Sequence, residues 1–383
     1  MPFIGPSARQ DVMMIGISKP CRKKSCSAIS RTVRCAESSL NSFRSKSPQV
    51  APLYQFQDKG KFALVTFNNI YVDLPKAAFQ LSDGTWAMPG LPVPDLGIWK
   101  EWVGSIRMEQ LAKANLVLFV EQPSNNPENY DQDHIRLGDS LSRLFLLIHL
   151  RSGIEYDSAD LLHGLSEENV PRIRHMGRFP PYYQSRGYRR APITKEWLED
   201  AVSLRTAVDA IEANKQEFRR VIRGLNTLTS GLKEQTGQER LHQFVRSLEA
   251  LILPDTGSTR NQFAHRCQTF AGAGEDTRAL LLEAFDMRSN TEHLHEWDKA
   301  VQNYPADQRE DVCWQRTRQI EHLACNAFSH LLHDAALRDH FKTDDRIAAF
   351  WKMRDDERSS LWGQPLDITK EPLVTEWRRN DDV

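Results

Sequence analysis

Short apolar runs without helical spacing follow residue 51. The runs at 62–67 and 115–120 are rich in β-branched and aromatic residues, which predicts two strands. A Pro/Gly-rich segment at 88–94 lies between them and predicts turns. The continuous apolar run at 141–150 fits a strand or a buried helix, because periodicity alone does not separate the two. We therefore expect a mixed, strand-rich domain over 51–170.

From residue 194 onward, apolar residues recur at helical spacing. Thr194 lies three residues before Trp197, the first residue of this pattern, which predicts that a helix starts there. Pro254 predicts the end of a later helix. About five helices over 194–345 predict a bundle. The fold class expected is α+β, with an N-terminal mixed strand-rich domain, a C-terminal α-helical bundle and a tail at 346–383.

Residues 171–193 form an irregular connector of distinct composition. Six arginines alternate there with four aromatic residues. Arginine pairs with phosphates and aromatic rings stack on bases, so the stretch is a candidate RNA-binding loop. The candidate contacts are Arg186, Tyr188, Arg189 and Arg190. A connector whose rings pack on a neighbouring surface explains the composition equally well.

Basic charge is concentrated in the head of the chain. Residues 1–50 carry a net charge of +7, the remainder carries −8, and the whole chain carries −1. The head is also rich in serine and lacks apolar periodicity, so we expect it to be disordered. An organellar transit peptide, or a start assigned upstream of the true first Met, accounts for the same composition.

Cysteine and histidine spacing favours no metal or cofactor. The six cysteines include no CxxC pair, which argues against a disulfide framework and a zinc site. His322, Cys325 and His333 lack a fourth ligand in a familiar pattern. No run approaches the ~20 apolar residues of a membrane span, so a soluble cytoplasmic protein is expected.

A candidate catalytic pair lies within the bundle at Arg288 and His293. RNA is cleaved without metal when its own 2′-OH attacks the adjacent phosphate. Histidine transfers protons near neutral pH, and the planar guanidinium of arginine holds phosphate oxygens. Five residues correspond to about 140° on an ideal helix, so the two side chains need a helix break or a second subunit.

The surroundings of this pair resemble the ApeA-like branch of the HEPN superfamily, whose motif is Arg-x4-6-His. The resemblance covers about 100 residues, from Arg240 to about Asn326. It includes the segments at 247–252, 263–267 and 285–289. It implies a ribonuclease with Arg288 and His293 as catalytic residues.

The resemblance also implies that two protomers pool their catalytic pairs in one cleft. The substrate is then RNA, and an activator or antitoxin is a further implied partner. The family's usual role is bacterial defence, through RNA cleavage that halts growth. Ser289 and Asn290 are secondary site residues, because related motifs use polar residues after the arginine to orient it or bind substrate.

Two alternative functions remain at this point. The family commonly has glycine after the histidine, whereas Leu294 stands here, which favours a non-catalytic scaffold for dimerisation or for nucleotide or RNA binding. The connector at 171–193 is a rival nucleic-acid site. A second Arg-x4-His pair, Arg260 and His265, lacks the aromatic lead of the first, and we interpret it as a charged helix start.

Overall fold

The computed structural model describes residues 54–93, 99–128, 130–151, 154, 156–179, 182 and 192–370. Several predictions fall on residues outside these ranges. They concern the basic head at 1–50, the last residues from 371, and the RNA-binding candidates Arg186, Tyr188, Arg189 and Arg190.

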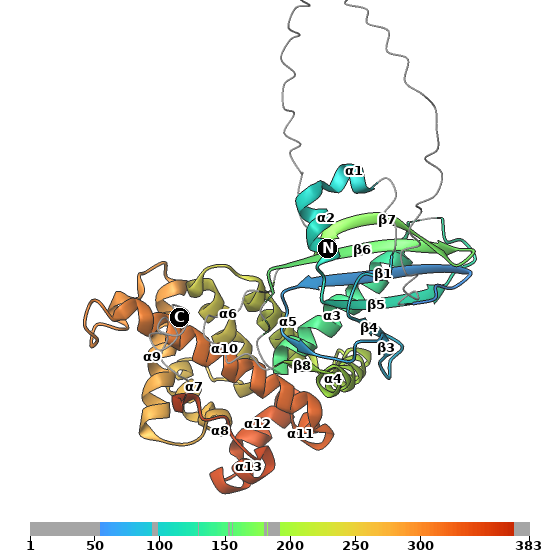
Figure 1. Ribbon diagram of the computed structural model, residues 1–383. Helices are drawn as coiled ribbons and strands as arrows, with labels where there is room; N and C mark the ends of the chain where they lie inside the picture. The colour runs from blue at the N-terminus through green and yellow to red at the C-terminus, as the bar shows by residue number, and fades with distance from the viewer. Residues whose placement is uncertain are drawn as a thin grey trace, which may run out of the picture. The chain divides into compact units, whose positions relative to one another are not determined.

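A six-stranded antiparallel sheet forms the N-terminal part of the described chain, in the order β3-β4-β5-β1-β6-β7 (Figure 1). The strands are β1 (Lys59–Asn68), β3 (Phe79–Gln80), β4 (Trp86–Met88), β5 (Leu116–Pro123), β6 (Ser158–Glu167) and β7 (Val170–Arg178). The two predicted strands are confirmed as β1 and β5. A short parallel pair joins β2 (Val72–Asp73) to β8 (Ile193–Thr194).

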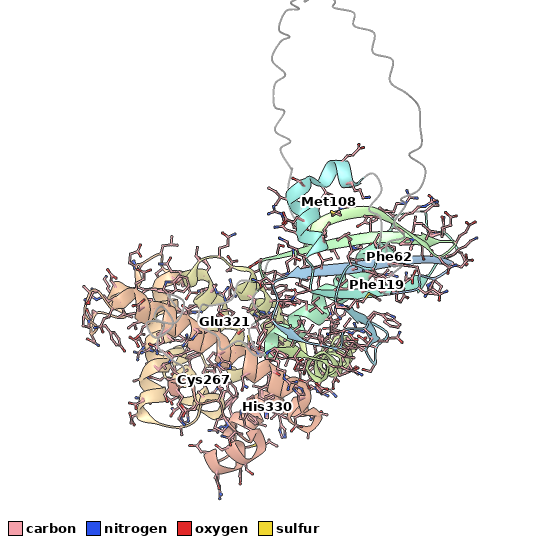
Figure 2. The ribbon with its side chains drawn as sticks, viewed as in Figure 1. Phe62, Met108, Phe119, Cys267, Glu321 and His330 are labelled. Atoms are coloured by element: carbon pink, nitrogen blue, oxygen red, sulfur yellow. The ribbon has the colours of Figure 1, made fainter. Side chains whose placement is uncertain are left out.

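Both faces of the central strand β1 are buried. Phe62 belongs to an apolar cluster with Phe119 on one face, where Met108 of α2 (Ser105–Ala112) packs against it (Figure 2). Ala63 and Phe67 belong to a second cluster on the other face, which α3 (Gln132–Arg151) covers. A strand buried on two sides needs a near-continuous apolar run, and residues 62–67 of β1 supply one that only Thr66 interrupts.

The run at 141–150, which the sequence left open between strand and helix, forms the second half of helix α3. This half of the helix is apolar on nearly all sides, because it packs between the sheet and the helices α4 (Lys195–Ala213) and α10 (Arg309–His333). A helix buried all round shows no clear polar face in its sequence.

The expected irregular stretch at 171–193 is wrong in its first part, because residues as far as Arg178 form strand β7. A two-residue turn joins it to β6, with Glu168 and Asn169 both at positive φ (51° and 62°). β7 is an edge strand whose arginines face solvent, so it lacks the apolar alternation that predicts strands.

The C-terminal part is helical, and Thr194 caps α4 as predicted, accepting a hydrogen bond from the Trp197 backbone at 3.3 Å. The other helices are α1 (Trp99–Val103), α5 (Arg219–Lys233), α6 (Gly237–Ile252), α7 (Thr259–Arg266), α8 (Gln268–Ala271), α9 (Glu275–Glu292), α11 (Ala335–His340), α12 (Asp344–Lys352) and α13 (Asp355–Trp362). Short 3-10 turns lie at Trp297–Lys299 and Ile368–Lys370. In the part of the chain that is described, no helix has the length and apolar character to cross a membrane.

Helical packing continues beyond the expected boundary at 345. Trp351, Trp362 and Ile368 are buried in the core that also contains α6 and α10. The region expected to be a tail is therefore part of the bundle as far as Lys370. Its helices are short and rich in charge, so they carry little helical periodicity.

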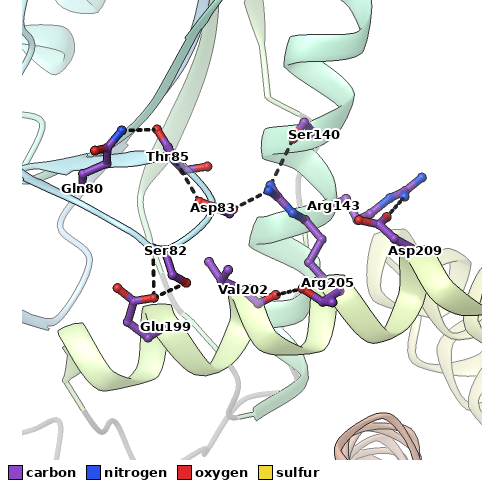
Figure 3. Close-up of polar contacts among 12 residues, drawn as sticks. Gln80, Ser82, Asp83, Thr85, Ser140, Arg143, Glu199, Val202, Arg205 and Asp209 are labelled. Atoms are coloured by element: carbon purple, nitrogen blue, oxygen red, sulfur yellow. Dashed lines mark hydrogen bonds and ion pairs between the residues drawn. The ribbon is translucent and has the colours of Figure 1, made fainter.

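Polar contacts attach the first bundle helix to the sheet (Figure 3). Arg205 of α4 pairs with Asp83, in the β3–β4 turn, at 2.5 Å, and donates to Ser140 of α3 at 3.1 Å. Glu199 accepts hydrogen bonds from the backbone and hydroxyl of Ser82 at 3.1 and 2.7 Å. One apolar core also runs without interruption from β1 through α3 into α4, α6 and α10.

A buried ion pair joins the two central helices of the bundle. Arg240 of α6 donates to Glu321 of α10 at 2.5 Å, and the side chains are 2% and 1% exposed. Figure 2 labels Glu321 near the middle of α10. Removing one member of a buried pair leaves the other charge in a medium that solvates it poorly.

We expect Glu321→Ala to lower the free energy of unfolding by about 3–5 kcal/mol, because the Arg240 guanidinium then remains buried after losing its ion pair with the Glu321 carboxylate. Urea denaturation measures this. Glu109→Ala, which removes an exposed pair with Lys113, is the matched control and should leave stability nearly unchanged. Equal effects of the two substitutions would contradict the prediction.

Two buried histidines are kept neutral by their surroundings. Burial lowers the pKa of His149 to about 3, and the positive charge of Arg240 lowers it further. Burial lowers the pKa of His163 to about 4, with smaller effects from His175 and His134. The unfolded chain binds these protons near pH 6.5, so stability is complete above that pH and declines as pH falls towards 4.

We therefore expect His149→Gln to flatten the dependence of stability on pH. Each such histidine contributes a slope of about 1.4 kcal/mol per pH unit between about pH 6 and 4. Urea denaturation at pH 7, 6 and 5 would show the variant losing less stability than the unmodified chain over this range. An unchanged slope would show that His149 takes up protons equally in the folded and unfolded states.

Candidate active site

Helix α9 carries Arg288 and is held between α6 and α7. Its buried side chains Leu281, Ala284 and Met287 recur at helical spacing and face the bundle core. Phe285 packs on Phe263 of α7, with ring centres 5.5 Å apart. The helix ends at Glu292, so Arg288 lies in its last turns.

The Arg288 guanidinium lies between two carboxylates. It donates through Nη2 to Glu249 of α6 at 3.4 Å, and through Nη1 to Glu292, one turn later on α9. Its Cζ atom lies 5.5 Å from the centre of the Phe285 ring, at the distance of a cation–π contact. The side chain is 13% exposed and is fixed in orientation.

The end of α9 is a left-handed cap built around His293. The backbone N–H of Leu294 donates to Thr291 at 3.0 Å, and that of His295 donates to Asn290 at 2.8 Å, which is the Schellman pattern. Leu294 has a φ of 56° and is 93% exposed. Glycine is the residue favoured at this position, whereas leucine occupies it here.

The helix ends at Glu292, directly before His293, but among the described residues no contact joins the side chains of Arg288 and His293. His293 is exposed, and its ring centre lies 6.3 Å from that of His295. Ser289 and Asn290 are half-buried, and their backbone carbonyls accept the capping hydrogen bonds of His293 and His295. The structure thus gives these two residues a role in shaping the helix end.

Helix α6 adds three residues that the motif did not reveal. His242, Arg246 and Glu249 occupy positions i, i+4 and i+7, which share one face of a helix. Burial raises the pKa of Glu249, although Arg288 and Arg246 act in the opposite direction. Burial also lowers the pKa of His242, and the charges of Arg288 and Arg246 lower it further. Glu249 lies in the segment at 247–252 that carries the family resemblance, whereas for His242 and Arg246 only the spacing on α6 is a sequence signal.

Three buried polar atoms of this cluster have no hydrogen-bond partner among the described residues. They are Nδ1 of His242, Oε1 of Glu249 and Nε of Arg288. Buried polar atoms are normally hydrogen-bonded, and a native structure contains few exceptions. Atoms of this kind also occur elsewhere among the described residues, for example in His149 and His163, so it is the grouping of these three around Arg288 that makes the cluster a candidate site.

The second Arg-x4-His pair has a structural role, in agreement with its interpretation as a charged helix start. Arg260, in the first turn of α7, donates two hydrogen bonds of 2.6 Å to the carboxylate of Asp286 on α9. His265 is exposed on α7. This bidentate pair joins α7 to the helix that carries Arg288.

The remaining candidate ligands are engaged in separate contacts. His333 lies 2.8 Å from Asp200 and 2.8 Å from the Ser329 carbonyl. Cys325 is buried, which raises the pKa of its thiol. Across the described ranges, no group of three or more His, Cys, Asp or Glu side chains is placed to hold a metal.

No protein-family model matches the chain, and searches of curated proteins and of solved structures likewise return no match. The resemblance of the α9 motif to HEPN domains therefore stays a prediction. What the structure adds is the geometry around Arg288, His293 and Leu294.

We expect Leu294→Gly to stabilise the protein by about 1 kcal/mol, because glycine adopts a positive φ without the steric conflict of a Cβ atom. Leu294→Ala is the matched control. It removes the exposed side chain and keeps the Cβ atom, so its stability should stay near that of the unmodified chain. Thermal and urea unfolding measure the stability of both variants. Equal stabilities of the Gly and Ala variants would show that the backbone at Leu294 is not strained.

Proposed function

We propose that this chain is a metal-independent endoribonuclease of the HEPN type. The proposal is supported above all by Arg288, held by Glu249 and Phe285 beside a helix end that presents His293 to solvent. The left-handed backbone at Leu294 supports it further, since the family commonly has glycine there.

The chemistry follows from the two side chains. The 2′-oxygen of RNA attacks the neighbouring phosphorus, and the bond from phosphorus to the 5′-oxygen breaks, leaving a cyclic phosphate. Negative charge grows on the non-bridging oxygens, and the guanidinium of Arg288 stabilises it through charge-assisted hydrogen bonds. His293 transfers a proton at an exposed position that RNA reaches.

The partners of such an enzyme are RNA and a second copy of the chain. In the family that the motif resembles, two protomers place their Arg and His residues in one cleft. An activator or antitoxin, and a role in bacterial defence, belong to the same proposal.

A non-catalytic scaffold is the second candidate, and a specific contact favours it. Both terminal nitrogens of Arg288 donate to carboxylates, from Glu249 and Glu292. An arginine paired in this way serves to fix α9 to α6. In that case the bundle is a dimerisation or nucleotide-binding module without chemistry of its own.

We expect the purified protein to cleave total RNA and defined tRNA in the presence of EDTA, and His293→Ala to reduce cleavage by about 100-fold or more. Arg288→Lys should reduce cleavage as well, because lysine lacks the bidentate fork. His293 is exposed, so its variant should keep the thermal stability of the unmodified chain.

His265→Ala is the matched control, since His265 is also exposed and follows an arginine by five residues. Its cleavage should equal that of the unmodified protein. Retained cleavage in His293→Ala would refute the site. Gel filtration complements this test, because a monomer at all concentrations would argue against a site shared between protomers.

A further inference from the structure

Helix α6 carries a histidine, His242, that feels the charges of Arg288 and Glu292 near the C-terminal end of α9. Two contacts define the relative direction of α6 and α9. The first is the ion pair of Glu249, near the C-terminal end of α6, with Arg288 of α9. At the other end, Gly237 packs near Trp297, where a Cβ atom added to the glycine would lie 3.8 Å from the ring. The helices are thus antiparallel, and His242, between Gly237 and Glu249, falls beside the C-terminal end of α9.

The surroundings of His242 suit a proton acceptor. The ring is partly exposed, whereas Nδ1 is buried and has no hydrogen-bond partner among the described residues. Charged groups face it from both helices: Glu239 and Arg246 on α6, and Arg288 and Glu292 on α9. Burial is the largest cause of its lowered pKa, and the arginines add to it, so the ring is neutral at neutral pH.

We propose that His242 is a second catalytic residue of this site, which accepts the 2′-OH proton of RNA while His293 protonates the leaving 5′-oxygen. This assignment rests on the ribonuclease proposed above. The O2′–P bond forms as the P–O5′ bond breaks. One proton passes from O2′ to His242 and another from His293 to O5′, so that both histidines change charge and no net proton is consumed.

A second histidine answers a chemical requirement of this reaction. The proton removed from O2′ and the proton delivered to O5′ are on opposite sides of the phosphorus in an in-line displacement, so two groups serve better than one. Arg288 lies between the α6 and α9 positions and pairs with residues of both helices. In this assignment the three side chains supply a base, a charge-stabilising group and an acid to the cleft that two protomers share.

The test compares two substrates that differ in their leaving group. One is an RNA dinucleotide, and the other is uridine 3′-(4-nitrophenyl phosphate), whose nitrophenolate departs without protonation. We expect His242→Gln to lower kcat by about 100-fold or more on both substrates, because the base is needed for both. His293→Gln should lower kcat on RNA to a similar extent, with most of this loss recovered on the nitrophenyl substrate.

Controls separate chemistry from folding and binding. His265→Gln should match the unmodified chain on both substrates, and His242→Gln and His242→Asn should keep its unfolding transition and its affinity for a 2′-deoxy RNA analogue within about 3-fold. The acid limb of the pH profile of kcat/KM should shift or disappear in the His242 variants.

Three results would overturn the assignment, and they are distinguishable. Cleavage by the unmodified chain that is lost in His293→Gln and retained in His242→Gln refutes the role of His242 alone. No cleavage by the unmodified chain under any tested condition refutes the ribonuclease and this assignment with it. Recovery of His242→Gln on the nitrophenyl substrate would likewise refute the role of base.

Discussion

The ion pair between Arg240 and Glu321 is the constraint on which the rest of the bundle depends. A buried charge pair tolerates little sliding of its helices, because displacement of one partner leaves the other charge in an interior that solvates it poorly. It therefore fixes the register of α6 against α10. His242, Arg246 and Glu249 lie roughly 180–240° around α6 from Arg240, so the same helix presents the candidate site on its opposite face.

The sequence predicts those parts of the fold whose environment matches the periodicity of the chain. β1 and β5 are buried on two faces and read as continuous apolar runs, and Thr194 caps α4 where its spacing to Trp197 indicates. α3 was ambiguous because a helix buried on all sides loses its amphipathic pattern. β7 was missed because an edge strand tolerates a row of arginines.

The sequence predicts only part of the candidate site, for a different reason. Arg288 and His293 lie in one motif, and local spacing is enough to propose them. His242 and Glu249 come from another helix, and their proximity to Arg288 depends on the packing of α6 against α9. The left-handed cap at Leu294 was also hidden, since leucine rarely adopts a conformation that glycine favours.

The carboxylates around Arg288 do not by themselves decide between an enzyme and a scaffold. Glu292 is 46% exposed, and an exposed ion pair contributes about 0.2–1 kcal/mol. A hydrogen bond from a guanidinium to a phosphate contributes about 1.5–3 kcal/mol. In the proposed ribonuclease, a phosphate would displace Glu292 from the guanidinium, while Glu249, 16% exposed, would keep it in place. What separates the two functions is whether proton-transfer groups stand beside that phosphate, and His242 and His293 are the side chains proposed for that role.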